Sequence, residues 1–261
     1  MKRITLIAIV TVFALTALSF TAGKGVTLRL RPQKDKVYVI KSKTTQTNTM
    51  KFQGQSMSST QTIETTQSMT AKEVSDTKNM FETQIDALKL NISQMGMNMQ
   101  YDSDNPQNTS PMIAGQVSKF EKIIKKPVNV TYDNLGRLEE TTDFEMSQLS
   151  NVIIELPENE VSVGSEWTYT KTQEISDMEV TVSMKVTVTG INKRGVDVSF
   201  TGTVDSKEVT GTYEGTSTIS QLTGLVMNSS IKNKISMTVT EQGMTMPVTV
   251  NGTTTISVEE K

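Results

Sequence analysis

The sequence contains neither cysteine nor histidine. Without cysteine there can be no disulfide, no thiolate nucleophile and no lipid-modified cysteine. Without either residue there can be no zinc site of the usual nitrogen and sulfur type, and the commonest general base is missing. The chain also lacks a phosphate-binding loop, a dinucleotide motif and a complete G-x-S-x-G elbow. We therefore expect a non-catalytic protein with no cofactor and no bound metal.

Long apolar runs are scarce too, and the one present opens the chain. Lys2 and Arg3 precede an apolar stretch over residues 4–20, and small residues follow it up to Gly23. This order is typical of a secretory signal peptide, although the run also approaches the length of a short membrane anchor. We predict a signal peptide over residues 1–23. The mature chain is then periplasmic or extracellular, and not membrane-spanning.

Charge of one sign does not dominate the sequence. There are 26 basic residues, two of them in the leader, against 28 acidic residues. Nucleic-acid binding normally needs a concentrated basic face, so nucleic acid is not an expected partner.

What is abundant is threonine and valine at alternate positions, the pattern of a strand with one face buried. It is clearest over residues 168–172, 180–188 and 196–200, and turn residues interrupt it near 132–136, 193–195 and 222–224. The pattern predicts a mainly β protein. We expect a curved antiparallel sheet or open β-barrel with one or two helices packed against it.

One helix is predicted after Ser110, which is placed as an N-cap before Pro111. Apolar residues then recur at helical spacing up to the stop at Pro127: Ile113, Val117, Phe120 and Ile124.

The predicted organisation is a single β-rich domain over residues 24–261. A second helix is predicted from the Thr142 capping box to just before Pro157. Similar strand openings at Tyr38 and Trp167 suggest two related halves, 24–110 and 160–261, joined by a helical middle over 111–156. Chance similarity between threonine-rich strands is the alternative.

Residues 44–70 alternate polar with polar, so neither face can bury much. We predict an edge or protruding hairpin that turns near Gly54, with Met50, Phe52 and Met57 at its tip. Such a tip could contact a membrane or a partner, or fold back onto the body.

Methionines recur at every second position in two places: Met95, Met97 and Met99, and then Met244 and Met246. Alternate residues of a strand share one face, so each set forms a stripe. Three interpretations stay open: adaptable core packing, the wall of an apolar cavity, or a thioether copper(I) site. The change of parity after Leu88, Leu90 and Ile92 also predicts a bulge or turn near Ser93 and Gln94.

Several strings occur in a recognisable order: 97–104 (MNMQYDSD), 126–138 (KPVNVTYDNLGRL), 156–167 (LPENEVSVGSEW), and 211–216 (GTYEGT) with 223–225 (TGL). In these strings the chain resembles the family called domain of unknown function 6263. The resemblance implies an exported bacterial envelope protein and brings no activity or site residues. A looser similarity is to lipoprotein-carrier folds, in which a curved sheet wraps around a helix and holds acyl chains.

Two functions follow as expectations. The first is binding of an apolar ligand, such as a lipid or acyl chain, in a cavity lined by the two methionine stripes and Phe120. The alternative is a structural or protein-interaction module of the cell envelope that binds another envelope protein through the 44–70 hairpin.

Overall fold

The computed structural model describes residues 25–52, 55–142, 152–175, 178–241 and 244–261. Twelve strands form one antiparallel sheet, which confirms the predicted fold class. The strands are β1 Val37–Phe52, β2 Gln55–Val74, β3 Lys78–Gln94, β4 Met97–Asp102, β5 Val128–Asp133, β6 Leu138–Thr141, β7 Glu166–Ile175, β8 Met178–Asn192, β9 Gly195–Asp205, β10 Val209–Ile219, β11 Val226–Glu241 and β12 Met244–Glu260.

The order of strands across the sheet is β6-β5-β3-β2-β1-β12-β11-β10-β9-β8-β7, and β4 pairs with β3 beside this path. Strands close in sequence are therefore neighbours, except at the centre. There β1 pairs with β12 over thirteen residue pairs, from Tyr38 with Glu260 to Met50 with Val248. This central pairing joins an N-terminal and a C-terminal set of strands into one sheet.

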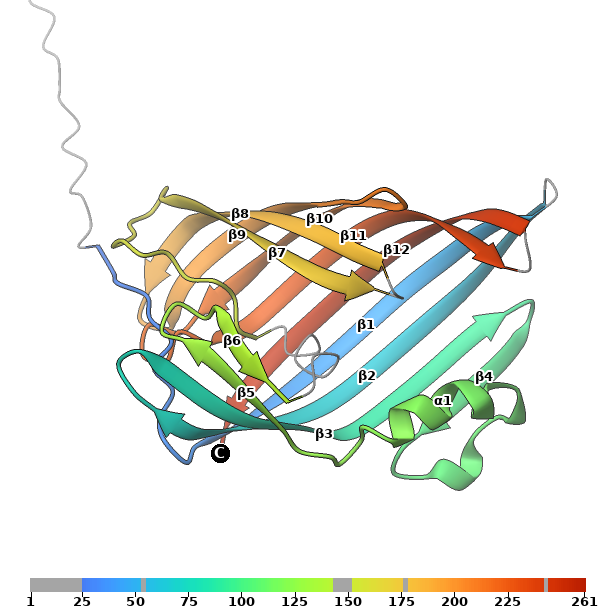
Figure 1. Ribbon diagram of the computed structural model, residues 1–261, viewed down its shortest axis with the longest axis horizontal. Coiled ribbons are helices and arrows are strands. Elements are labelled where there is room, and N and C mark those ends of the chain that lie inside the picture. Colours follow the sequence, from blue (N-terminus) through green and yellow to red (C-terminus); the bar gives the residue numbers. More distant parts are fainter. Residues whose placement is uncertain (1–24, 53–54, 143–151, 176–177, 242–243) are drawn as a thin grey trace, which may run out of the picture.

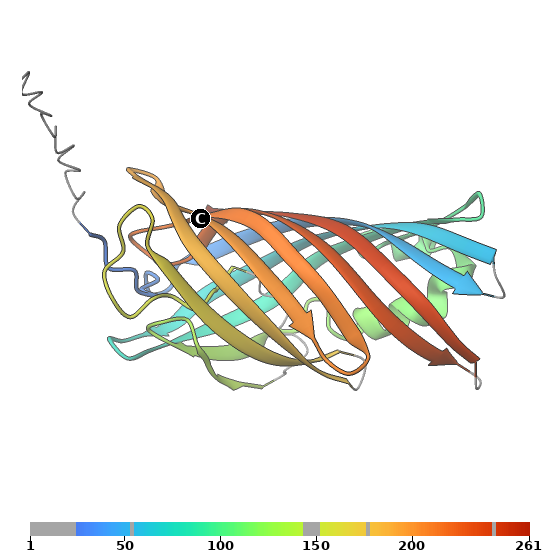
Figure 2. The ribbon, with the colours of Figure 1, turned by 90° about the horizontal axis from the view of Figure 1, so that it is seen from above.

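The sheet curves around a hollow and is not closed within the described residues, because β6 and β7 end it without pairing with each other. The strands are long: β2 has 20 residues and spans roughly 65 Å at about 3.3 Å per residue. Figure 1 shows β5 and β6 in front of the long strands of the sheet, and Figure 2 shows the long strands crossing the molecule obliquely.

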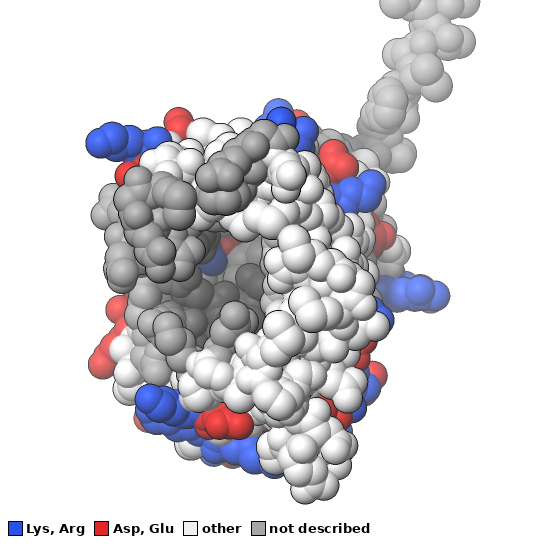
Figure 3. Space-filling model, turned by 90° about the vertical axis from the view of Figure 1, so that its right-hand side faces the viewer, with Lys and Arg blue, Asp and Glu red and all other residues white. Residues whose placement is uncertain are grey.

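One end of the hollow is filled by the main hydrophobic core. The N-terminal segment crosses this end: the Leu30 amide donates to the Asn134 carbonyl at 2.8 Å, and the Arg31 amide donates to the Thr223 carbonyl at 2.9 Å. Leu28 and Leu30 are fully buried there with Tyr38, Phe81 and Leu225. Figure 3 views the opposite end, where the molecule is hollowed and charged atoms lie inside the hollow. The hollow is thus closed by the hydrophobic core at one end and open at the other.

Hydroxyl and amide pairs occupy the middle of the sheet's inner face. They join neighbouring strands: Ser42 with Thr65 at 2.7 Å, Thr44 with Thr254 at 2.9 Å, and Gln46 with Gln61 at 3.1 Å. Cross-strand pairs of this kind satisfy polar groups that a purely apolar face would leave without partners. They explain how a polar-alternating segment can belong to the inner face.

The 44–70 segment does form a hairpin, from β1 and β2, but it is central in the sheet and not at an edge. Both of its strands have a further partner, because β1 pairs with β12 and β2 pairs with β3. The edge position was predicted from the polarity of the segment alone. The prediction was wrong because strands distant in the sequence supply hydroxyl and amide groups that pair with it, and the sequence does not show this pairing.

Helical structure is brief in the described residues. Two short 3₁₀ turns, η1 (Pro106–Asn108) and η2 (Pro111–Ile113), precede the helix α1 (Ala114–Glu121). Ser110 precedes Pro111 as predicted, but its hydroxyl accepts a hydrogen bond from the Gln100 amide at 3.0 Å and caps no helix. The predicted 111–156 middle also contains the strands β5 and β6. Most of the predicted second helix lies outside the described residues, and its last residues, 152–156, are not helical.

The helix covers only β3 and β4, near the open end, and does not plug the hollow (Figure 1). Ile113 and Val117 are buried there in a small cluster with Leu90, Met99 and Tyr101. The predicted helix face is therefore correct at these two positions. Phe120 remains 40% exposed because α1 ends one residue after it.

Candidate ligand-binding cavity

A cavity of about 680 Å³ lies inside the curve of the sheet, next to the main core. One wall is the inner face of β7 to β12. The other wall is made by Tyr132 of β5, by Arg137 and Leu138 at the start of β6, and by residues 153–155. This volume lies within the usual range of small-molecule sites. The sheet and these residues together border a space for a ligand.

The cavity surface combines apolar and polar groups. Its aliphatic, methionine and phenylalanine side chains are Leu138, Ile153, Ile154, Val182, Met184, Val186, Phe200, Val226 and Ile231. Alternate residues of β8 supply three of them, as expected for a strand with one face turned inward. Contact with an apolar ligand here would remove its surface from water, which is favourable by about 25 cal/mol per Å².

Glycines on the inner face keep the cavity hollow. A Cβ at Gly202 would collide with the Met184 sulfur, and a Cβ at Gly215 would collide with the Phe200 ring. Both large side chains therefore lie flat over the neighbouring strand, where the absence of a Cβ leaves room for them.

Three charged side chains reach the cavity: Arg137, Glu155 and Lys171. Arg137 binds Glu155 at 2.9 Å and Glu158 at 3.1 Å, and the hydrogen bond that Arg137 donates to the Glu155 carboxylate is the main cause that raises the pKa of Arg137. Burial lowers the pKa of Lys171 below its usual 10.5, and the nearby Glu155 carboxylate opposes this only in part. Lys171 is thus a solvent-exposed cation that the surrounding protein partly desolvates.

Two tyrosines place hydroxyl groups on the same surface. Burial raises the pKa of Tyr169 to about 12, and it also raises the pKa of Tyr213. Both phenols keep their protons at neutral pH and can donate hydrogen bonds. They lie in one cross-strand row, because Tyr169 pairs with Met184, Met184 with Gly202, and Gly202 with Tyr213.

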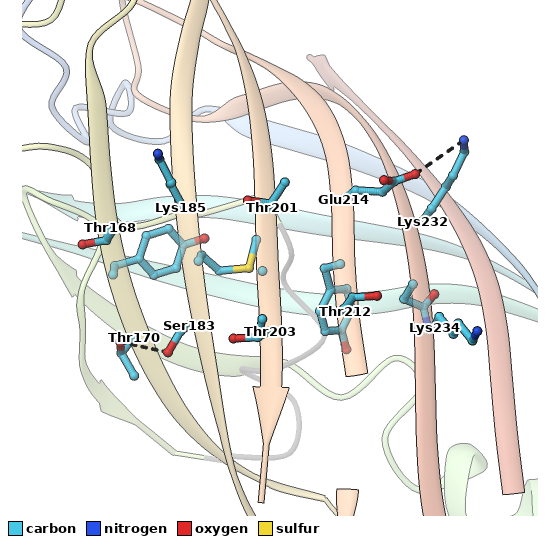
Figure 4. A pocket seen from close by; sticks show the side chains of 15 residues that line it. Thr168, Thr170, Ser183, Lys185, Thr201, Thr203, Thr212, Glu214, Lys232 and Lys234 are labelled. Atoms are coloured by element: carbon cyan, nitrogen blue, oxygen red, sulfur yellow. Dashed lines mark hydrogen bonds and ion pairs between the residues drawn. The ribbon is translucent and has the colours of Figure 1, made fainter. Parts of the chain in front are cut away.

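A second and more open hollow of about 870 Å³ adjoins this cavity and is drawn in Figure 4. Ten of its lining residues belong to the opposite strand parity and carry hydroxyl groups or charges, among them Thr168, Lys185 and Thr201. Figure 4 shows that pairs already occupy part of it: Lys232 with Glu214 at 3.7 Å, and Thr170 with Ser183 at 3.5 Å. Because it is more open than the main cavity and these pairs already occupy part of it, it encloses an apolar ligand less well.

The first methionine stripe lies outside both hollows. Met95 and Gly96 form the turn between β3 and β4, both with positive φ, which agrees with the predicted turn. Met95 is 69% exposed and Met97 is 46% exposed, whereas Met99 is buried beneath α1. The stripe thus divides between surface and local core. Binding of a ligand by these methionines or by Phe120 stays a prediction.

The remaining predicted residues lie toward the open end of the sheet. Met50 pairs with Met57 across the β1–β2 hairpin, and Phe52 ends β1. Met244 begins β12, and Met246 is half-buried two residues later. The structure brings Met50 and Met57 together, but it joins none of these residues to the cavity lining. The proposed interaction role of the tip is untouched by this placement.

Sequence reasoning missed the residues that do line the cavity. Trp167, Tyr169 and Lys171 share one parity of β7, and threonines occupy the positions between Trp167 and Lys171. That parity could have indicated which side of β7 turns inward. The lysine obscured the signal, because a charged residue in a threonine-rich strand normally indicates an outer face.

Comparison with known proteins gives a likeness of fold. A structure of lipovitellin, described in terms of its lipid–protein interactions, aligns with 87% of this chain at 11% identity and a TM-score of 0.52. The chain spans only 25% of the lipovitellin chain. The likeness is therefore one of fold alone, between the curved antiparallel sheet of this chain and a part of the lipovitellin chain.

Two bacterial structures align with lower scores. One is an outer membrane channel from Pseudomonas putida F1, at 8% identity over 91% of this chain and 98% of that chain, with a TM-score of 0.25. The other is an outer membrane lipoprotein-sorting protein domain from Vibrio parahaemolyticus, at 11% identity over 85% of each chain, with a TM-score of 0.17. TM-scores this low do not establish a common fold.

No family model and no curated protein sequence matches the chain. The resemblance to domain of unknown function 6263 therefore stays a prediction from the sequence strings. No helix of the described residues is long and apolar enough to cross a membrane. No cluster of acidic side chains in the described residues is suited to hold a metal ion.

Proposed function

We propose that this protein binds an apolar or amphipathic ligand, such as a lipid or acyl chain, without catalysing a reaction on it. The observation that carries the proposal is the cavity of about 680 Å³ between the inner face of the sheet and residues 132, 137–138 and 153–155. The lipovitellin likeness supports it at the level of fold. The secretory pattern of residues 1–23 supports a site of action in the cell envelope or outside the cell.

The direct test is native mass spectrometry of the protein purified gently from its own source, with an organic extract of the same sample analysed alongside. We expect a stoichiometric additional mass that partitions into the organic phase. A bare protein mass, together with no uptake of an added uncharged dye such as N-phenyl-1-naphthylamine, would contradict the proposal and favour the interaction role of the β1–β2 hairpin.

Filling the cavity should abolish this binding. Ile231 lies partly buried on the cavity wall, so Ile231→Trp adds a large side chain where the ligand would lie. We expect at least about a tenfold loss of dye affinity, since a well-placed apolar contact contributes about 1.5–3 kcal/mol. Fluorescence titration measures it.

The matched control is Ser230→Trp. Ser230 is the neighbouring residue on β11, and it is exposed on the other face of the sheet. Its dye affinity should equal that of the wild type. Equal losses in both variants would show that the dye binds elsewhere.

A further inference from the structure

The charged side chains of the cavity differ in whether they have an ion-pair partner. The inference drawn from this difference rests on the proposed function. Arg137 and Glu155 are joined at 2.9 Å, and Arg137 also binds Glu158. Among the described residues, no ion pair or hydrogen bond involves the Lys171 side chain. One cation in the cavity therefore lacks a counter-ion from the part of the chain that the structure describes.

Lys171 also lies among apolar neighbours. It pairs across the sheet with Val182, and the same row continues through Val204, Gly211 and Ile235. Solvent reaches Lys171, yet surrounding protein removes enough of its hydration to lower its pKa. A lysine held in such surroundings gains more from an anion than a lysine in open water does.

A hydrogen-bond donor lies close to Lys171 along β7. Tyr169 is two residues away on the same face, about 7 Å along the strand. Tyr213 lies in the Tyr169 row but three strands away, roughly 14 Å across the sheet. No described residue accepts a hydrogen bond from the Tyr169 hydroxyl. A cation with a neighbouring phenol is suited to an oxygen anion, which accepts several hydrogen bonds at once.

We propose that the cavity binds a single-chain amphiphile with an anionic head, and that Lys171 binds this head while the chain lies over the apolar inner face of β8 to β11. Among the described residues Lys171 has no ion pair, so its ammonium group is available to an anionic head. The adjoining aliphatic surface, including Val182, Val186 and Ile231, is suited to a hydrocarbon chain. A long-chain carboxylate and a long-chain phosphate share this chemistry.

The test uses the full mature chain loaded with N-phenyl-1-naphthylamine, an uncharged dye, and displaces the dye with dodecanoate or with dodecanol. The two competitors share one chain length and differ in charge. The wild type should prefer dodecanoate about tenfold, the usual size of a hydrogen bond to a charged group. Lys171→Met keeps the length of the side chain but removes its charge, and it should abolish this preference. Lys171→Arg should keep it.

The surface variant Lys185→Met is the matched control. Lys185 lies on β8 and pairs with Glu166 at 2.9 Å, outside the main cavity. Its preference should equal that of the wild type. Dodecyl phosphate, tested in parallel, identifies a phosphate head if it is favoured over dodecanol in the wild type but not in Lys171→Met.

The possible results distinguish a failure of the Lys171 assignment from a failure of the proposed ligand binding. If Lys171→Met binds dye normally and still prefers dodecanoate, the assignment to Lys171 is overturned while the apolar cavity stands. If the wild type binds neither dye nor amphiphile, the proposed function fails and this inference fails with it.

The preference should also depend on pH. Lys171 is charged below its lowered pKa and neutral above it, so the preference for dodecanoate should be constant near neutrality and decline as the pH rises through that pKa. In Lys171→Met the preference should be absent at every pH. A wild-type profile that stays flat up to pH 10.5, the usual pKa of lysine, would contradict a charge–charge contact.

Discussion

Replacement of Phe81 by alanine should lower the free energy of unfolding by about 3–5 kcal/mol, the usual cost of emptying a buried phenylalanine site. Phe81 on β3 is fully buried in the core that stoppers the hollow. Its ring meets Tyr132 edge-on, with ring centroids 6.1 Å apart. The contact adds to the pairing of β3 with its neighbouring strand β5, which also supplies a cavity residue. Urea unfolding measures the loss.

Phe120→Ala is the matched control, because it removes the same side chain from a position that is 40% exposed. It should cost less than about 1 kcal/mol, as surface substitutions usually do. Similar losses in the two variants would mean that the core around Phe81 does not govern stability.

Gly224→Ala should destabilise the protein by about 2–5 kcal/mol, because two penalties combine there. Gly224 has a φ of +72°, which side chains rarely adopt, and a Cβ would collide with the carbonyl oxygen of Arg29. The neighbouring Thr223 carbonyl accepts a hydrogen bond from Arg31. The variant should therefore loosen the N-terminal segment over the stoppered end, and hydrogen exchange at residues 28–31 should rise.

Gly164→Ala separates the conformational cost of a positive φ from the cost of the steric collision. Gly164 has a φ of +89°, but a Cβ there would meet nothing within 4 Å. It should cost only about 1–2 kcal/mol, the conformational part. Equal effects at Gly164 and Gly224 would show that the close approach of the Arg29 backbone adds nothing.

Much of the fold follows from local patterns. Valines at every second position correctly predicted strands in the C-terminal half of the chain. The predicted turns near 132–136, 193–195 and 222–224 all lie between strands. Ser110 and Pro111 marked the start of the short helical region. These features depend on backbone preferences of neighbouring residues, which a sequence displays directly.

The arrangement of strands in space depends on distant partners, which the sequence does not display. The polar 44–70 hairpin became central because β12 and β3 supply matching hydroxyl and amide groups, such as Thr254 opposite Thr44. The methionine pattern near Met97 identified a strand but not its surroundings. There α1 buries Met99 and leaves Met97 exposed. Likewise, the sequence does not show that Lys171 lines one cavity with Arg137 and Glu155, which come from a distant part of the chain.

The pairing of β1 with β12 has a consequence for how the chain can fold. Tyr38 and Glu260 are neighbours in the sheet although 222 residues separate them along the chain. The central strand pair therefore cannot form until the last strand has emerged from the ribosome or a translocation channel. Folding dominated by such distant contacts is slow, because a long loop must close before the contacts stabilise it. Until then both partner strands expose unpaired backbone groups, and a chaperone that shields strand edges should raise the yield of folded protein.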